Sequence, residues 1–280
     1  MSDRHPFGPP PSGPPTPGDP PPPVGVPAST SPPTGHRVRP WWGLGDVLLG
    51  LVVMVVASGL GLIVALPFTD LQAVQGGDPL PASATAIALL VQQAAQFGWA
   101  VGVSRWKGLG PRLDWRLDIR PVDPVVGVGT AIMALGLAGA VAAIVAALVD
   151  LDDAAEASNV AVLSDAEGSA WLPVVVAAVV LGAPLAEEFF FRGLVLRAIE
   201  KRAGPVVAVI GSTAVFTLPH YVGAGLDGTL VLFAAIGTVG LVLGTVTVVV
   251  GRLWPAIIAH MLFNGLGAAQ ALGAFDPAVS

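Results

Sequence analysis

The sequence contains no cysteine among its 280 residues, which excludes disulfide bonds and thiolate-ligated metal centres. Charged residues are also scarce, at 11%, whereas a soluble globular domain typically has about 25%. Hydrophobic residues make up 54% of the chain, and the mean hydropathy is +0.76. This composition predicts a protein that crosses a membrane several times. The net charge is −6, and we expect no nucleic-acid partner.

Proline is distributed unevenly along the chain. Residues 1–35 contain 14 of the 27 prolines, and glycine, serine and threonine fill most of the remaining positions. Such a segment buries too little apolar area to offset the entropy cost of ordering it, and its prolines favour polyproline II conformation. We therefore expect residues 1–40 to form a disordered tail. The tail lacks the basic segment followed by a short apolar core that is typical of a signal peptide.

Apolar segments follow the tail, each near the ~20 residues that a helix needs to cross a bilayer. There are seven, at residues 44–66, 82–104, 122–149, 171–195, 205–220, 229–250 and 253–272. The predicted fold is therefore all-α, a polytopic bundle of about seven transmembrane helices. We divide it into three N-terminal spans, within residues 41–150, and a core of four membrane helices, within residues 170–272.

The charged residues predict an orientation. In this arrangement all 13 basic residues fall on one side of the membrane, and the connections on the other side carry only acidic charges. The positive-inside rule then places the N-terminal tail in the cytoplasm and the C-terminus outside. We expect a multi-pass protein of the plasma membrane, and the spans and composition are typical of a bacterial protein.

Two groups of polar side chains inside the predicted spans require attention. Gln92, Gln93 and Gln96 share the second span; interhelical hydrogen bonds or a cavity would explain them, and we favour hydrogen bonds. An ionisable residue at the centre of a membrane helix costs roughly 2.5–3.5 kcal/mol on insertion scales, so the second group requires an explanation. That group comprises Glu187, Glu188 and Arg192 of the fourth span, His220 of the fifth, and His260 and Asn264 of the seventh.

Helical spacing assigns provisional roles to the second group. Glu188 and Arg192 are four residues apart, the spacing at which a carboxylate and a guanidinium meet on one helix face, so we expect a structural ion pair. Glu187 points about 100° away from Glu188 and therefore faces a different neighbour. If the fourth and fifth spans form a hairpin that turns at residues 203–204, Glu187 and His220 lie level, each about 24 Å from the turn.

A glutamate and two histidines from three helices, with an amide beside one histidine, can activate water. Glu187, in a low dielectric, could take a proton from a water that a histidine holds, while His260 and Asn264 donate to a tetrahedral oxyanion. Alternatively, Glu187, His220 and His260 could bind zinc, with water in the open position. The usual H-E-x-x-H zinc helix is absent.

The motifs, taken in order, resemble those of a known family. Glu187-Glu188-x-x-x-Arg192, Phe216-x-x-x-His220 and His260-x-x-x-Asn264 follow one another on successive membrane helices. Together they resemble the CPBP family, which comprises the CAAX prenyl proteases and the bacteriocin-processing (Abi) intramembrane proteases. The resemblance covers about residues 170–272. It implies an intramembrane endopeptidase, or metalloprotease, that hydrolyses a peptide bond of a membrane-anchored peptide or protein.

The resemblance also implies roles for the motif residues. Glu187 and His220 would activate the water, and His260 and Asn264 would stabilise the oxyanion. The Glu188–Arg192 pair would support them. The family has also been described as metal-dependent, so a divalent metal such as zinc, held by His220, His260 and Glu187, stays open as a cofactor.

The expected partners are membrane lipid and a hydrophobic or lipidated peptide or protein substrate. A hypothesis of another class is a non-catalytic membrane binder, such as an immunity or scaffolding protein of the same fold. A transporter ranks lower, because the chain shows no inverted repeat. A purely structural interpretation, in which the ion pair joins two helices and the histidines are satisfied core residues, explains each residue alone better than it explains the six together.

Overall fold

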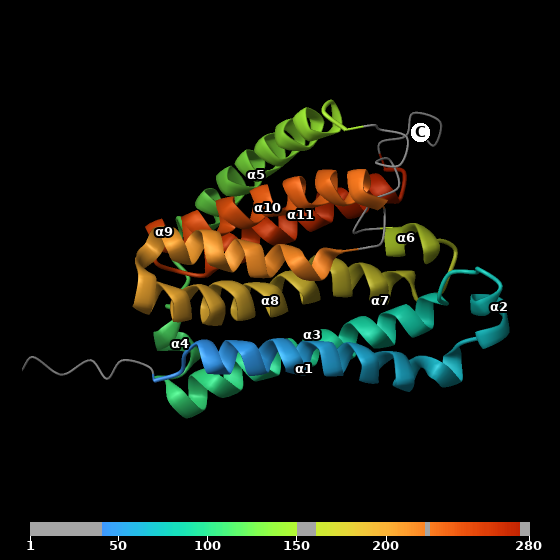
Figure 1. The fold of residues 1–280 in the computed structure, drawn as a ribbon, viewed down its shortest axis with the longest axis horizontal. Coiled ribbons are helices and arrows are strands. Elements are labelled where there is room, and N and C mark those ends of the chain that lie inside the picture. The colour runs from blue at the N-terminus through green and yellow to red at the C-terminus, as the bar shows by residue number, and fades with distance from the viewer. Residues whose placement is uncertain (1–40, 150–160, 222–224, 275–280) are drawn as a thin grey trace, which may run out of the picture. The chain divides into compact units, whose positions relative to one another are not determined.

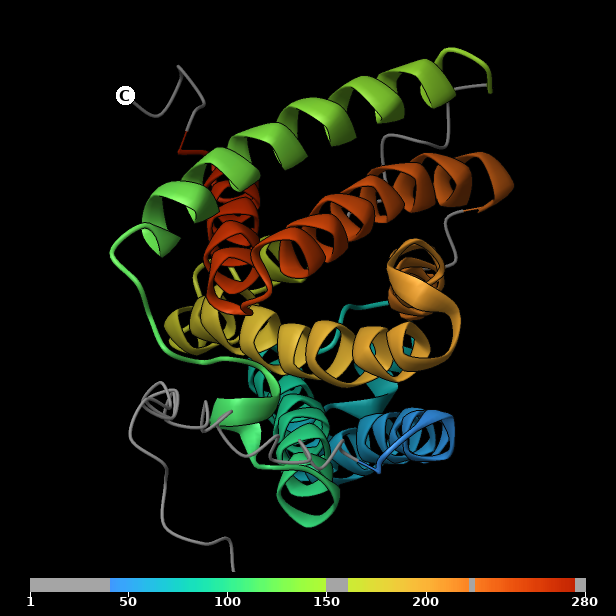
Figure 2. The same cartoon turned by 90° about the vertical axis from the view of Figure 1, so that its left-hand side faces the viewer.

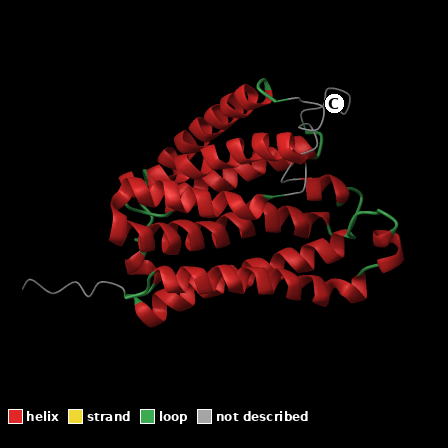
Figure 3. Ribbon diagram, viewed as in Figure 1, coloured by secondary structure: helices red, strands yellow, loops and turns green. Residues whose placement is uncertain are grey.

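A computed structural model describes residues 41–149, 161–221 and 225–274, and within these ranges the chain is helical and contains no strand (Figure 3). The predicted all-α class is confirmed. The predicted disordered tail, residues 1–40, lies outside the described residues.

The helices are of unequal length and alternate with short irregular elements (Figure 1). Their bounds are α1 Leu44–Ala65, η1 Leu66–Phe68, α2 Leu71–Gln75, α3 Ala82–Lys107, α4 Pro111–Asp114, α5 Asp123–Ala146, α6 Ala161–Asp165, α7 Leu172–Ala177, η3 Ala178–Gly182, α8 Ala183–Glu187, η4 Glu188–Val195, α9 Leu196–Thr217, η5 Leu218–His220, α10 Gly225–Val250 and α11 Trp254–Ala271. Elements η1 and η5 are 3-10 turns, whereas η3 and η4 are π-helical.

Five helical runs in the described part of the chain are long and apolar enough to cross a membrane. They are Leu44–Phe68, Ala82–Lys107, Asp123–Ala146, Leu172–His220 and Gly225–Val250. The fourth run combines the predicted fourth and fifth spans. The chain leaves helical geometry at Gly204 (φ 80°, ψ 175°) and then continues directly as helix, so the two spans form one run. Helix α11 is not among the five; it has 18 residues and carries His260 and Asn264. The chain is thus an integral membrane protein, while seven spans and a cytoplasmic N-terminus stay predictions.

The helices of residues 41–274 lie in layers around the segment from α7 to η4. Helices α1 and α3 pair with each other, and α3 covers one face of that segment (Figure 1). Helices α9 and α11 cover the other face, α10 packs on α9 and α11, and α5 lies outermost against α10 and α11 (Figure 2). The third long helix of the chain is therefore on the opposite side of the central segment from the first two.

The predicted hairpin between the fourth and fifth spans is present. Helix α9 turns at Gly204 and its second arm packs back on the first: a Cβ at Gly211 would lie 3.0 Å from Cδ1 of Ile199. Glycine also lets α10 approach α9, because a Cβ at Gly240 would lie only 2.9 Å from Cγ2 of Thr213. Close approach through small residues is the usual basis of helix packing in membranes.

A buried ion pair joins helix α5 to the connection between α10 and α11. Nε of Arg252, in the α10–α11 connection, donates to Oδ1 of Asp123 at 3.1 Å. Asp123 is fully buried at the first residue of α5. One turn further along, Gly127 packs directly on Ile258 of α11, where a Cβ would lie 2.6 Å from Cγ2. These contacts hold α5 against the helix that carries the third motif.

Candidate active site

The helix that carries the first motif is irregular on both sides of Glu187. It is π-helical in η3 and again in η4, and single π turns within helices are frequent at functional sites. Pro184 has no N–H and cannot donate to the carbonyl of Val179, five residues earlier. Nδ2 of Asn264 donates to that carbonyl instead, at 2.9 Å. The irregularity therefore fixes the third motif beside the first.

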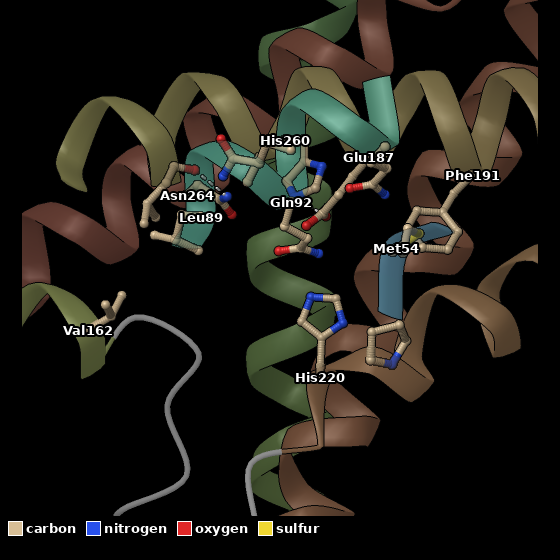
Figure 4. Close-up of a pocket in the computed structure, with 14 residues that line it drawn as sticks. Met54, Leu89, Gln92, Val162, Glu187, Phe191, His220, His260 and Asn264 are labelled. Atoms are coloured by element: carbon tan, nitrogen blue, oxygen red, sulfur yellow. Dashed lines mark hydrogen bonds and ion pairs between the residues drawn. The ribbon is translucent and has the colours of Figure 1, made fainter. Parts of the chain in front are cut away.

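One cavity of about 200 Å³ brings together the four predicted catalytic residues (Figure 4). Glu187 comes from α8, His220 from η5, and His260 and Asn264 from α11. Figure 4 shows Glu187 and His260 on one side of the cavity and the ring of His220 pointing in from another. Helices α1, α3 and α6 add three apolar side chains and three glutamines to the wall, and η3, α8, η4 and η5 complete it with apolar residues. Glu187 and His220, which residue counting predicted to lie level, thus line the same cavity.

Glu188 lies behind the cavity and links two of the motifs. It is fully buried, and its Oε1 lies 3.1 Å from Nη1 of Arg192, in the ion pair expected from the spacing. The same oxygen accepts a hydrogen bond from Nδ1 of His260 at 2.9 Å. Because an ionised carboxylate only accepts, Nδ1 carries the proton, and Nε2 faces Glu187 with 3.7 Å to Oε2. This contact joins residues 72 positions apart, so spacing along one helix does not reveal it.

Phe216 connects the second motif to the other two. Its carbonyl oxygen lies 2.9 Å from Nδ1 of His220, and a carbonyl only accepts, so Nδ1 donates and Nε2 of the neutral ring keeps its lone pair. The Phe216 ring lies 5.0 Å from the ring of His220 and 6.0 Å from that of His260, between centroids. The guanidinium of Arg192 stacks over its face at 4.2 Å, a cation–π contact. Phe216 thereby orients both histidines, whereas the sequence identified it only as the first residue of a motif.

The three glutamines of α3 have different surroundings. Nε2 of Gln93 donates to the carbonyl oxygen of Ala178 in η3 at 3.1 Å, which is an interhelical hydrogen bond. Gln92 and Gln96 line the cavity, and neither side chain has a hydrogen-bond partner among the described residues. Interhelical hydrogen bonding is therefore observed for Gln93, and in the described part of the chain it is not observed for Gln92 or Gln96.

The donor geometry does not form a metal site. No group of three His, Asp or Glu side chains within 41–149, 161–221 and 225–274 could hold a metal ion. His260 turns Nδ1 to Glu188, and His220 turns Nδ1 to a backbone carbonyl. A divalent metal held by Glu187, His220 and His260 stays a prediction.

Comparison with known proteins matches part of the chain. Residues 169–266 match the family model described as Rce1-like, "Type II CAAX prenyl endopeptidase Rce1-like". The matched segment contains all three motifs and begins after the three N-terminal long helices. It confirms the family resemblance that the motifs predicted. No curated protein and no solved structure matches the chain significantly.

Proposed function

Starting from the CAAX protease family that residues 169–266 match, we propose that the chain is an intramembrane endopeptidase. Its substrate is a membrane-anchored peptide or protein, hydrophobic or lipidated. One observation carries the proposal: Glu187 and His220, from different helices, line one cavity, and Nε2 of His220 has no partner in the part of the chain that the structure describes. A carboxylate and an imidazole lone pair at one cavity are what water activation requires.

The first step is attack by water. The water donates one hydrogen bond to Nε2 of His220 and loses its other proton to Glu187 as its oxygen bonds to the scissile carbonyl carbon. When the tetrahedral intermediate collapses, the C–N bond breaks and Glu187 returns the proton to the leaving amine nitrogen. The bond from His220 to the Phe216 carbonyl fixes the tautomer that this step needs.

The developing oxyanion is stabilised from α11. Asn264 uses one amide N–H on the Val179 carbonyl and has a second N–H to offer. His260 donates through Nε2 when both ring nitrogens are protonated, the form in which its two N–H groups face Glu188 and Glu187. Removing one such donor typically lowers kcat about 10²–10³-fold. Glu188 and Arg192 act through His260 by holding its ring.

Glu187→Gln tests the proposal, because the amide has nearly the shape of the carboxylate and cannot accept the proton. We expect turnover to fall about 10²–10⁴-fold. Since the substrate is unidentified, the measurement is a comparison of protein termini in membranes of cells that express the wild-type or the variant chain. New internal termini should appear only with the wild type. Glu200→Gln, at a surface carboxylate paired with Arg197, is the matched control and should retain them. Identical termini for wild type and Glu187→Gln would favour the non-catalytic binder instead.

A further inference from the structure

Gln92 and Gln96, two of the three glutamines of α3 that line the cavity, have no assigned role. Gln96 is 1% exposed, and its Nε2 has no hydrogen-bond partner among the residues that the structure describes. Leaving a buried amide unpaired costs about 1–3 kcal/mol, so such groups are rare in native proteins. Gln92 lies four residues earlier on the same helix face, and Figure 4 shows its amide extending into the cavity toward Glu187, His260 and His220.

The chemistry of these amides matches that of a peptide backbone. A carboxamide offers two N–H donors and one acceptor oxygen, which pair with the C=O and N–H of a peptide group. A substrate segment must leave helical geometry before its scissile carbonyl can meet water. Its freed backbone groups then have no water to bind in hydrocarbon, and each unsatisfied group costs several kcal/mol. The wall beside the glutamines offers apolar side chains such as Leu89, Met54 and Val162.

We propose that Gln92 and Gln96 form a subsite that binds the main chain of the substrate next to the scissile bond. This inference rests on the proposed function of the cavity. Both residues lie before residue 169, outside the segment that matches the family model. Because Gln92 and Gln96 bind backbone groups, we expect them not to discriminate between substrates that differ in their side chains. Gln93 takes no part, since its amide is bonded to Ala178.

The test uses the full chain in lipid nanodiscs and an internally quenched, farnesylated peptide that ends in a CAAX sequence. Methionine replaces glutamine with similar length and volume but without the amide. In Gln92→Met and in Gln96→Met we expect KM to rise about 5- to 10-fold with kcat within about twofold, because an interaction made equally in the ground and transition states is lost. Gln270→Met, at an exposed glutamine of α11 that does not line the cavity, is the matched control, and its KM should not change.

Peptides with a single ester in place of an amide near the cleaved bond locate the contact. At one ester position, KM should rise for the wild type but should not rise further in Gln96→Met. If the ester and Gln96 acted independently, their effects on KM would be additive. Unchanged KM in both methionine variants, or additive effects at every ester position, would overturn the subsite.

A binding measurement distinguishes the proposed subsite from the proposed catalytic activity. The affinity of the same farnesylated peptide is measured on inactive Glu187→Gln protein, alone and combined with Gln92→Met or Gln96→Met. Weaker binding in the combined variants supports the subsite even if the wild type fails to cleave the peptide, a result that would count only against the proposed function. Equal binding, or no binding by Glu187→Gln protein at all, counts against the subsite.

Discussion

Purified His220→Asn protein is expected to cleave its substrate about 10²–10⁴ times more slowly than the wild type while unfolding at nearly the same temperature. The asparagine amide lies near the position of Nδ1 and can continue to donate to the carbonyl of Phe216. What the variant loses is Nε2, the atom that we propose binds the attacking water. Initial rates with the farnesylated quenched peptide in nanodiscs, together with thermal unfolding curves, measure both effects.

His220→Gln is the companion variant, because its amide reaches nearer to the position of Nε2. The glutamine oxygen can accept a hydrogen bond from water, so the rate should fall less than in His220→Asn. A wild-type rate in His220→Asn would remove His220 from the mechanism. If both variants unfolded at a much lower temperature, the ring would be a structural element rather than a ligand for water.

Arg192→Met is expected to destabilise the bundle by about 3–5 kcal/mol, because it leaves the buried carboxylate of Glu188 without its cation. The exposed pair of Arg112 and Asp118 is the matched control, with side chains 80% and 61% exposed. There Arg112→Met should cost only about 0–1 kcal/mol. Unfolding free energies in detergent micelles compare the two losses.

A double variant isolates the cause of the effect. Glu188→Gln combined with Arg192→Met removes both charges, so much of the lost stability should return, as it does when buried ion pairs are replaced by neutral groups. Activity should stay low in the double variant, because glutamine cannot hold Nδ1–H of His260 as the carboxylate does. Equal costs for Arg192→Met and Arg112→Met would show that the buried pair contributes little to folding.

Much of the site could be predicted because its geometry is set within single helices or one tight turn. Four-residue spacing was sufficient for Glu188 and Arg192. Counting residues on either side of Gly204 predicted that Glu187 and His220 lie level, and both line one cavity. By contrast, the bond between Glu188 and His260 depends on how two helices are rotated about their axes, which spacing along one helix does not determine. The carbonyl of Phe216 could not be identified either, because every residue has one.

The surroundings of the site were harder to predict for a different reason. In a membrane helix, lipid-facing and protein-facing sides are both apolar, so hydrophobic periodicity does not separate them. Thus the hydrophobic pattern of α3 does not show that its glutamines line the cavity. Nor does the sequence of residues 122–149 show that α5 packs on the opposite side of the central segment from α1 and α3. Close contacts such as Gly127 against Ile258 decide that placement, and they depend on shape rather than hydropathy.

The position of α5 has a consequence for biosynthesis. Asp123 and its partner Arg252 are 129 residues apart, so at about 5–20 residues per second the ribosome needs roughly 6–26 s to deliver the second after the first. Throughout that interval α5 lacks Arg252, the buried ion-pair partner of its carboxylate, and its glycine face has no neighbour. We expect membrane quality control to recognise nascent chains halted before α10 by the unpartnered α5. An insertase or chaperone that shields α5 would act mainly at this stage.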